Sequence, residues 1–292
     1  MKHRLVWGLA LAAALGGILA LWKIQTVPAP PRGLFCWQAS VMQPDRSEAL
    51  WDCMAQQNLN ELYQVIPSQA DAAQTAAFLR QAQENGITVF LLVGDPAWGL
   101  DPQGTELCAA VDRVAQWKQE LGEDAPVGIM ADVEPYLTDA WQEDSQAVMQ
   151  SYLHGMHAAY AAAELAGVRL DICISCYYDS WGLEPQLQEL IETACHGVAV
   201  MNYYRGKEAE HLKTEWDLAN NAGKPLRTIY ELQAPGSHDI TEQNTYYGVG
   251  LDALRDNWAH LTRTLGGDSS PGYALHDYAA LQEVLRGKED AP

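Results

Sequence analysis

The feature of this sequence that most constrains its fold is a strand–helix pattern that recurs eight times after residue 33. Each repeat is a short apolar, β-branched or aromatic run, followed by a polar loop and a helical stretch. Helical segments such as "DAAQTAAFLRQAQENG" end in glycine just before the next run, which is a helix-stop signal. The strand-like runs are "GLFCWQ" (33–38), "NELYQVI" (60–66), "ITVFLLVGD" (87–95), "VGIMADVE" (127–134), "RLDICISCYYD" (169–179), "GVAVMNYY" (197–204), "LRTIYEL" (226–232) and "GYALHDY" (272–278).

Strands that alternate with helices predict parallel pairing, and near-continuous apolar strands predict a sheet covered on both faces. Eight such units within residues 33–292 match the size of a (β/α)8 barrel. An open, doubly wound sheet is the alternative, but no glycine-rich phosphate loop follows the first run. The sequence therefore predicts an α/β fold with a single (β/α)8 (TIM) barrel over residues 33–292 and no second domain.

The first 32 residues form a separate segment. Lys2, His3 and Arg4 precede an uncharged apolar run of eighteen residues, Leu5–Trp22, and a proline-rich spacer follows. This length is at the lower limit for crossing a bilayer, and Ile18 and Ala20 make a poor signal-peptidase site. Residues 1–32 are therefore predicted to be an uncleaved transmembrane signal anchor with a spacer, which holds the barrel outside the cell membrane. A cleaved signal and a secreted barrel are the alternative.

Composition limits the partners. The formal net charge is −20, which argues against nucleic acid or an anionic lipid surface as the main partner. The six cysteines do not form a disulfide framework, and the two of "CISC" (173–176) face opposite sides of a strand, so buried free thiols are expected. The eight histidines have no metal-ligand spacing. We expect a monomer without a catalytic metal or cofactor.

Polar and aromatic side chains gather where the strand-like runs end. In a barrel of this kind the chemistry lies at the carboxyl ends of the strands. Carboxylates among Trp and Tyr rings favour a carbohydrate ligand, because a sugar offers apolar faces for stacking and hydroxyls for hydrogen bonding. From the first to the eighth run, these side chains are Trp37; Asp95 and Trp98; Asp132, Glu134 and Tyr136; Tyr177, Asp179 and Trp181; Asn202, Tyr203, Tyr204 and Arg205; Glu231 and Gln233; His276 and Tyr278.

Asp132 and Glu134 lie two residues apart, so they share one face of a strand. Glycosidic cleavage needs one carboxylic acid that protonates the leaving oxygen and a second group that stabilises the cationic centre. Two neighbouring carboxylates raise the pKa of one of them, which keeps that acid protonated near neutral pH. A purely structural role is the alternative for Asp132 as a loop-ordering residue, and for His276 as a hydrogen-bonded core histidine.

These strand ends resemble those of the TIM-barrel glycoside hydrolases, and in part those of the family 18 chitinases. The D-x-E that ends the fourth strand of those chitinases matches Asp132 and Glu134, and their M-x-Y on the sixth matches Met201 and Tyr203. The resemblance implies that Glu134 is the general acid. It also implies that Asp132 orients the substrate's 2-acetamido group as the nucleophile and that Tyr203 holds its carbonyl. The sequence departs from the pattern at Met130, where an acid is expected.

Two further resemblances lead to other assignments. Glu134 with the following proline, and Glu231 on the seventh run, are similar to the acid/base and nucleophile pair of the cellulase and β-glycosidase superfamily. The runs "DVEPY", "MNYYR", "IYELQ" and "ALHDY" resemble a group of exported bacterial glycosidase-like barrels. On strand alternation, Arg227, Glu231 and Gln233 share one face, with the last two at the barrel mouth.

The sequence therefore predicts a glycoside hydrolase that cleaves a cell-surface or environmental polysaccharide. Glu134, Asp132, Glu231 and Tyr203 are the predicted catalytic residues. The other side chains named above at the strand ends are predicted to bind the substrate. The alternative is a non-catalytic carbohydrate-binding or envelope scaffold protein on the same barrel. The two differ in the partner of Glu134, which faces an open aromatic cleft in the enzyme and pairs with Arg205 in the scaffold.

The N-terminal run yields the first testable prediction. Because its apolar core is long and lacks a cleavage site, protein recovered from the membrane fraction is expected to retain residues 1–32. Mass spectrometry of the intact chain tests this. A mature N-terminus between residues 20 and 30 would show that the run is a cleaved signal.

Overall fold

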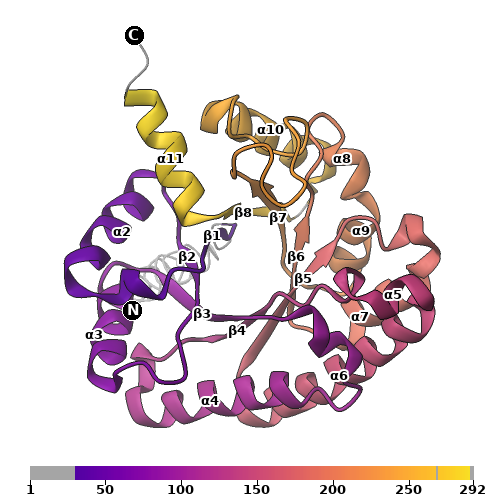
Figure 1. Ribbon diagram of the computed structural model, residues 1–292, viewed down its shortest axis with the longest axis horizontal. Helices are drawn as coiled ribbons and strands as arrows, with labels where there is room; N and C mark the ends of the chain where they lie inside the picture. The colour runs from indigo at the N-terminus through magenta and orange to yellow at the C-terminus, as the bar shows by residue number, and fades with distance from the viewer. Residues whose placement is uncertain (1–29, 268, 290–292) are drawn as a thin grey trace, which may run out of the picture. The chain divides into compact units, whose positions relative to one another are not determined.

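The computed structural model of the protein describes residues 30–267 and 269–289. Within them, eight parallel strands form a closed barrel in chain order, with helices around its outside (Figure 1). The predicted (β/α)8 barrel is thus confirmed. Seven of the strand-like runs contain a whole strand, and the first strand begins one residue before its run, at Arg32. The strands are β1 (Arg32–Cys36), β2 (Glu61–Gln64), β3 (Thr88–Val93), β4 (Gly128–Ala131), β5 (Arg169–Ser175), β6 (Gly197–Met201), β7 (Leu226–Glu231) and β8 (Gly272–His276).

Helices follow the strands, and several have capping side chains that define where they begin. The carboxylates of Asp71 and Asp144 accept the backbone N–H groups of Gln74 and Ala147 at 2.8 and 2.9 Å, and so satisfy free donors at the first turns of α3 and α6. The α-helices are α2 (Pro44–Gln56), α3 (Ala72–Glu84), α4 (Thr105–Leu121), α5 (Asp139–Glu143), α6 (Ser145–Ala166), α7 (Glu184–Thr193), α8 (Glu208–His211), α9 (Lys213–Asn221), α10 (Gly250–Leu265) and α11 (Tyr278–Glu289).

Short helical turns connect several of these elements. They are the 3-10 turns η1 (Ala39–Met42), η2 (Pro96–Leu100), η3 (Gly122–Asp124) and η4 (Pro135–Leu137), and the π-helical turn η5 (Asp179–Leu183).

Inward-facing side chains fill the barrel in layers. The middle layer is apolar and includes Phe35, Phe90, Met130, Cys173 and Ile229, which are all buried. The outward-facing side chains of the strands form a second, larger core with the helices, in which Cys176 lies. The two cysteines of "CISC" therefore face opposite sides of β5, as expected. All six cysteines lie within the described residues and are unpaired, and five of them are buried.

A buried ion cluster closes the amino end of the barrel. Arg227 donates to both carboxylate oxygens of Glu61, at 2.6 and 2.7 Å, and to Asp171 at 2.9 Å. Arg169 binds the same Asp171 carboxylate through two hydrogen bonds, and the Tyr63 hydroxyl donates to Glu61. The Arg227 side chain is only 1% exposed. Because each charge has a partner of opposite sign, the cluster avoids the cost of an isolated buried charge.

Residues 1–29, which hold the predicted membrane anchor, lie outside the described residues, so the anchor stays a prediction. Among the residues that the structure does describe, no helix is both long and apolar enough to cross a membrane.

The ion cluster yields a stability prediction. Arg227→Ala leaves Glu61 and Asp171 buried without their shared partner, so we expect it to lower the free energy of unfolding by about 3–5 kcal/mol. The matched control is Arg80→Ala, which breaks the Arg80–Asp124 pair, where the arginine is 59% exposed. That change should cost about 1 kcal/mol or less. Urea denaturation measures both, and a similar small loss in the two variants would contradict the proposed importance of the cluster.

Candidate active site

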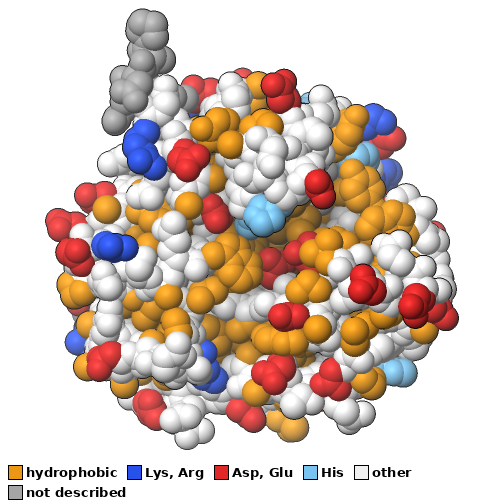
Figure 2. All heavy atoms as spheres, viewed as in Figure 1, with side chains coloured by type: hydrophobic (Ala, Val, Ile, Leu, Met, Phe, Trp, Pro, Cys, Tyr) orange, Lys and Arg blue, Asp and Glu red, His pale blue; other side chains and the backbone are white. Residues whose placement is uncertain are grey.

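A cavity of about 940 Å³ opens at the carboxyl ends of the strands. Figure 2 shows this face with a hollow near its centre, where acidic and hydrophobic side chains come together. Ten of the residues predicted from the sequence line the cavity: Trp37, Asp132, Glu134, Tyr136, Tyr177, Trp181, Tyr203, Glu231, Gln233 and His276.

The two acids after β4 are positioned by close packing against β3. The backbone N–H of Asp132 donates to the carbonyl oxygen of Val93 at 2.7 Å. Gly94 follows Val93 in the chain, and a Cβ added to it would lie 1.9 Å from the Asp132 carbonyl oxygen. Any other residue at Gly94 would push the end of β4 away. The glycine thus fixes where the Asp132 and Glu134 side chains enter the cavity.

The environment of Asp132 favours a bound proton. Burial, and then the nearby charge of Glu134, raise the pKa of Asp132 to about 7, although His276 and a hydrogen bond from Cys173 oppose this shift. Its Oδ1 atom is buried without a hydrogen-bond partner among the described residues. The Asp132 carboxyl, which lies beside Glu134, therefore keeps its proton up to near-neutral pH.

Glu134 is held by its neighbour Tyr136. The Tyr136 hydroxyl donates a short hydrogen bond to Oε2 of Glu134 and also lies 3.7 Å from the sulfur of Met201. Among the described residues, no hydrogen bond occupies the other carboxylate oxygen of Glu134. One oxygen of this acid is therefore fixed, and the other can face a ligand in the cavity.

Glu231 and His276 form a second pair, on β7 and β8. Oε1 of Glu231 accepts the backbone N–H groups of Leu232 and Gln233, at 2.9 and 2.7 Å, and Oε2 lies 2.9 Å from Nδ1 of His276. Nε2 of His276 accepts the indole N–H of Trp37 at 3.3 Å, so Nδ1 carries the proton that is donated to Glu231. Both carboxylate oxygens of Glu231, which is 2% exposed, are therefore occupied.

This pairing changes the acidity of the histidine. Burial by itself lowers the pKa of His276, but the hydrogen bond and the negative charge of Glu231 outweigh it, so the pKa is raised above its usual value of 6.5. Burial and the charge of Glu231 likewise raise the pKa of Tyr203, whose hydroxyl thus stays protonated and able to donate.

Aromatic rings form one wall of the cavity. The ring centroid of Trp181 lies 5.6 Å from that of Tyr136 and 5.9 Å from that of Tyr177, with which it stacks. Two tryptophans of the cavity lining are exposed: Trp37 is 37% exposed and Trp181 is 43% exposed. These surfaces offer flat apolar faces beside the carboxylates.

Seven residues predicted at the site lie outside the cavity lining. Asp95 caps η2 by accepting the N–H of Ala97, and Asp179 accepts hydrogen bonds from Thr214 and Ser180. Trp98 and Tyr278 pack against the outer core. The remaining three, Asn202, Tyr204 and Arg205, lie in the loop between β6 and α8.

The loop between β7 and α10, residues 232–249, contributes to the cavity but contains only one predicted site residue, Gln233. His238, Asp239, Ile240 and Asn244 of this loop line the cavity, and the Asn244 amide donates to the backbone carbonyl of Tyr203 at 2.6 Å. Its length was the available signal, because long loops in compact barrels commonly carry function. Leu137 and Ser175, which also line the cavity, gave no such signal.

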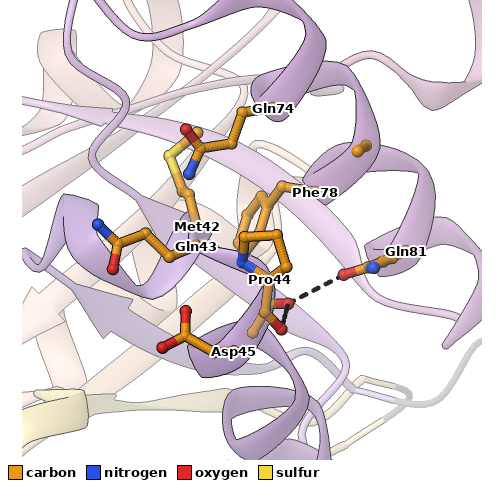
Figure 3. A pocket seen from close by; sticks show the side chains of 9 residues that line it. Met42, Gln43, Pro44, Asp45, Gln74, Phe78 and Gln81 are labelled. Atoms are coloured by element: carbon orange, nitrogen blue, oxygen red, sulfur yellow. Dashed lines mark hydrogen bonds between the residues drawn. The ribbon is translucent and has the colours of Figure 1, made fainter.

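A second, smaller cavity of about 470 Å³ lies between the start of α2 and α3 (Figure 3). The Ser47 hydroxyl in its wall donates to Gln81 at 3.0 Å, and Phe78 contributes an apolar surface. Asp45 is the only ionisable residue among those that line it. The cavity thus lacks the paired acids of the larger one. In the described part of the chain, no group of three or more His, Cys, Asp or Glu side chains is arranged to hold a metal ion.

Neither a scan of protein-family models nor a search of curated proteins finds a match for this sequence. Solved structures with the same fold include a family 18 chitinase from Pseudoalteromonas aurantia, with 8% identity and a TM-score of 0.60, covering 89% of this chain and 100% of the other. A family 18 chitinase from Cycas revoluta, in a complex with allosamidin, has 12% identity, a TM-score of 0.55 and coverages of 88% and 98%.

The spore cortex-lytic enzyme SleL from Bacillus megaterium is a further structural neighbour, with 10% identity, a TM-score of 0.52 and coverages of 91% and 75%. At such identities the likeness shows the fold alone. The expected resemblance to glycosidase-type TIM barrels, chitinases among them, is confirmed at that level.

The Glu231–His276 pair yields a prediction about acidity. Glu231→Gln removes the negative charge that raises the pKa of His276, so the imidazole should lose its proton at a lower pH than in the unmodified protein. NMR titration of the His276 ring measures this shift. Asp95→Asn, a change of an exposed carboxylate outside the cavity, is the control and should leave the titration unchanged. An unaltered His276 pKa in Glu231→Gln would mean that the pair does not set the acidity of the ring.

Proposed function

We propose that this protein is a glycoside hydrolase that uses the Asp132–Glu134 pair as its acid. The observation that carries the proposal is the raised pKa of Asp132, about 7, beside Glu134 in an open cavity walled by Trp and Tyr rings. A carboxyl that retains its proton near neutral pH beside a second carboxyl group meets the first requirement of glycosidic cleavage. The common fold of the protein and several chitinases supports the same reaction class.

Glu134 donates the proton in this proposal. Its unoccupied carboxylate oxygen faces the cavity, while Tyr136 holds the other oxygen. Glu134 protonates the glycosidic oxygen, and the bond to the leaving sugar breaks as the oxygen of the substrate's 2-acetamido group bonds to the anomeric carbon. Water, deprotonated by Glu134, then attacks that carbon, which releases the acetamido oxygen and returns the proton to Glu134; the Tyr136 hydroxyl stabilises the charge on Glu134 between the two steps. While Glu134 holds the proton, the ionised Asp132 accepts a hydrogen bond from the substrate through its unpartnered Oδ1.

Glu231 has a positioning role in this proposal, rather than that of a nucleophile. Its two oxygens accept two backbone N–H groups and the Nδ1–H of His276, and these bonds hold the carboxylate in place and disperse its charge, which weakens it as a nucleophile. This supports the mode in which the 2-acetamido group of the substrate attacks, with Asp132 orienting that group and Tyr203 donating to its carbonyl. Glu231 then fixes the His276 ring at the cavity floor.

The charges of the cavity restrict the substrate. Its lining contains five acidic residues, Asp132, Glu134, Glu231, Asp239 and Asp277, and no Lys or Arg. Anionic sugars would meet uncompensated repulsion there. We propose a polysaccharide of neutral sugars as the substrate, with N-acetylated amino sugars as the first to test. A chitinase of this fold from Cycas revoluta has been solved with three N-acetylglucosamine units bound.

The scaffold alternative predicts that Glu134 pairs with Arg205. Instead, Glu134 is bonded to Tyr136, and the Arg205 guanidinium donates to the backbone carbonyl of Glu242 at 2.7 Å. These partners favour the enzyme. For the location of the enzyme, we propose that the barrel is exported and held at the cell membrane by residues 1–32.

Hydrolysis of N-acetylglucosamine oligosaccharides by the fragment from residue 30, which keeps all of β1 and its bonds to β8, tests the proposal. Glu134→Gln should lower kcat by about 10²–10⁴-fold, since it removes the general acid. Asp132→Asn should also lose most of the activity, whereas Glu231→Gln should lose about tenfold, because its effect passes through His276. The rate of the unmodified enzyme should fall as pH rises through about 7, where Asp132 loses its proton.

The same series can overturn the assignment. Near-normal turnover in Asp132→Asn, together with an inactive Glu231→Gln, would identify Glu231 as the nucleophile. Binding of oligosaccharides without any hydrolysis at any pH would favour the non-catalytic alternative.

A further inference from the structure

A row of aromatic rings leads out of the cavity across the loops that follow β5 and β6. Trp181 and Tyr177, which line the cavity, stack with centroids 5.9 Å apart. The ring centroid of Tyr177 lies 5.4 Å from that of His211 in α8, and the centroid of His211 lies 5.8 Å from that of Tyr204. His211 and Tyr204 are not part of the cavity lining. The ring surface thus continues past the rim.

The two ends of this row are open to a ligand. Trp181 is 43% exposed and Tyr204 is 36% exposed, which places both among the exposed large hydrophobic side chains of the described residues. The exposed parts of these two rings are available to a ligand. Exposed aromatic faces suit a polysaccharide, whose units present apolar faces of their own.

The outer part of the row is held rigidly from below. Asn202 is 2% exposed and its amide donates to the backbone carbonyl of Glu208 at 2.9 Å. The buried Glu208 carboxylate accepts the N–H of Gly206 at 2.7 Å and the hydroxyl of Tyr246. This support reduces the conformational entropy that a ligand would otherwise have to remove from the loop.

A second set of bonds ties the same loop to residues 232–249. The backbone N–H of Arg205 donates to the carbonyl of Gln243 at 2.9 Å, next to the Arg205–Glu242 bond. Asn202 and Arg205, predicted from the sequence to bind the substrate, thus also hold the loop that carries Tyr204.

We propose that Tyr177, His211 and Tyr204 form an outer subsite that binds the part of a neutral polysaccharide chain extending beyond the cavity. The inference rests on the proposed function and adds that binding depends on the length of the polysaccharide chain. A disaccharide is short enough to lie within the 940 Å³ cavity, whereas longer oligosaccharides reach the outer rings. Affinity should consequently rise with chain length, and Tyr204 should contribute to that rise.

Binding of N-acetylglucosamine oligosaccharides of two and six units to Glu134→Gln protein, measured by calorimetry, tests the subsite without turnover. Adding Tyr204→Ala should weaken hexasaccharide binding by about tenfold and disaccharide binding much less. Tyr204→Phe retains the ring and should restore the hexasaccharide affinity. Tyr160→Ala is the matched control, because the Tyr160 ring also packs against a histidine, His196, with ring centroids 4.7 Å apart. His196 directly precedes β6, so this pair lies at the other end of the barrel.

Each result has a distinct meaning. Equal losses for the two oligosaccharides in Tyr204→Ala, or no loss for the hexasaccharide, would overturn the outer subsite while leaving the hydrolase proposal in place. A similar loss in Tyr160→Ala would also overturn it, since the effect would then be one of folding. If neither oligosaccharide binds the parent protein, the proposed substrate and the subsite that depends on it are both wrong.

Discussion

The alternation of side chains along each strand of a closed barrel is the constraint on which the rest of this structure depends. On β7, Arg227, Ile229 and Glu231 all face inward, and each belongs to a different layer. The arginine completes the ion cluster at the amino end, the isoleucine joins the apolar layer, and the glutamate reaches the cavity. Because the amino end and the middle are filled, the carboxyl end is the place where the interior can accept a ligand.

The same alternation explains which parts of the site could be predicted from the sequence. Asp132 and Glu134 on one side, and Glu231 with Gln233 on the other, follow directly from strand parity, and all four line the cavity. Tyr278 was expected there because it ends an apolar run, but it starts α11 and packs outward. The residues of the loop 232–249 could not be placed, because their positions depend on long-range bonds such as that from Asn244 to Tyr203. Such bonds leave no periodic signal in a sequence.

The departure from the chitinase pattern at Met130 has a physical consequence for the acid pair. Met130 is fully buried in the apolar layer beneath Asp132, together with Cys173, where the pattern has a further carboxylate. A methionine there adds no negative charge but removes water, so the acidity of Asp132 is set mainly by burial and by Glu134. His276, which is hydrogen-bonded to Glu231, acts in the opposite direction and lowers the pKa of Asp132. Residues that are distant in the chain, Glu134 after β4 and His276 on β8, thus jointly set the pKa of Asp132.

In the proposed hydrolase, substrate binding and proton retention are coupled. A sugar that enters the cavity displaces water from around Asp132 and Glu134, and this further disfavours two negative charges side by side. The bound pair therefore holds its proton at a higher pH than the empty one. Rings outside the cavity, such as Tyr204, strengthen binding without touching the acids. In the proposed enzyme, a polysaccharide chain held by these rings would keep its next units in the cavity, and this would also favour the protonated form of Asp132. Distant aromatic contacts and acid catalysis would then be linked through one binding equilibrium.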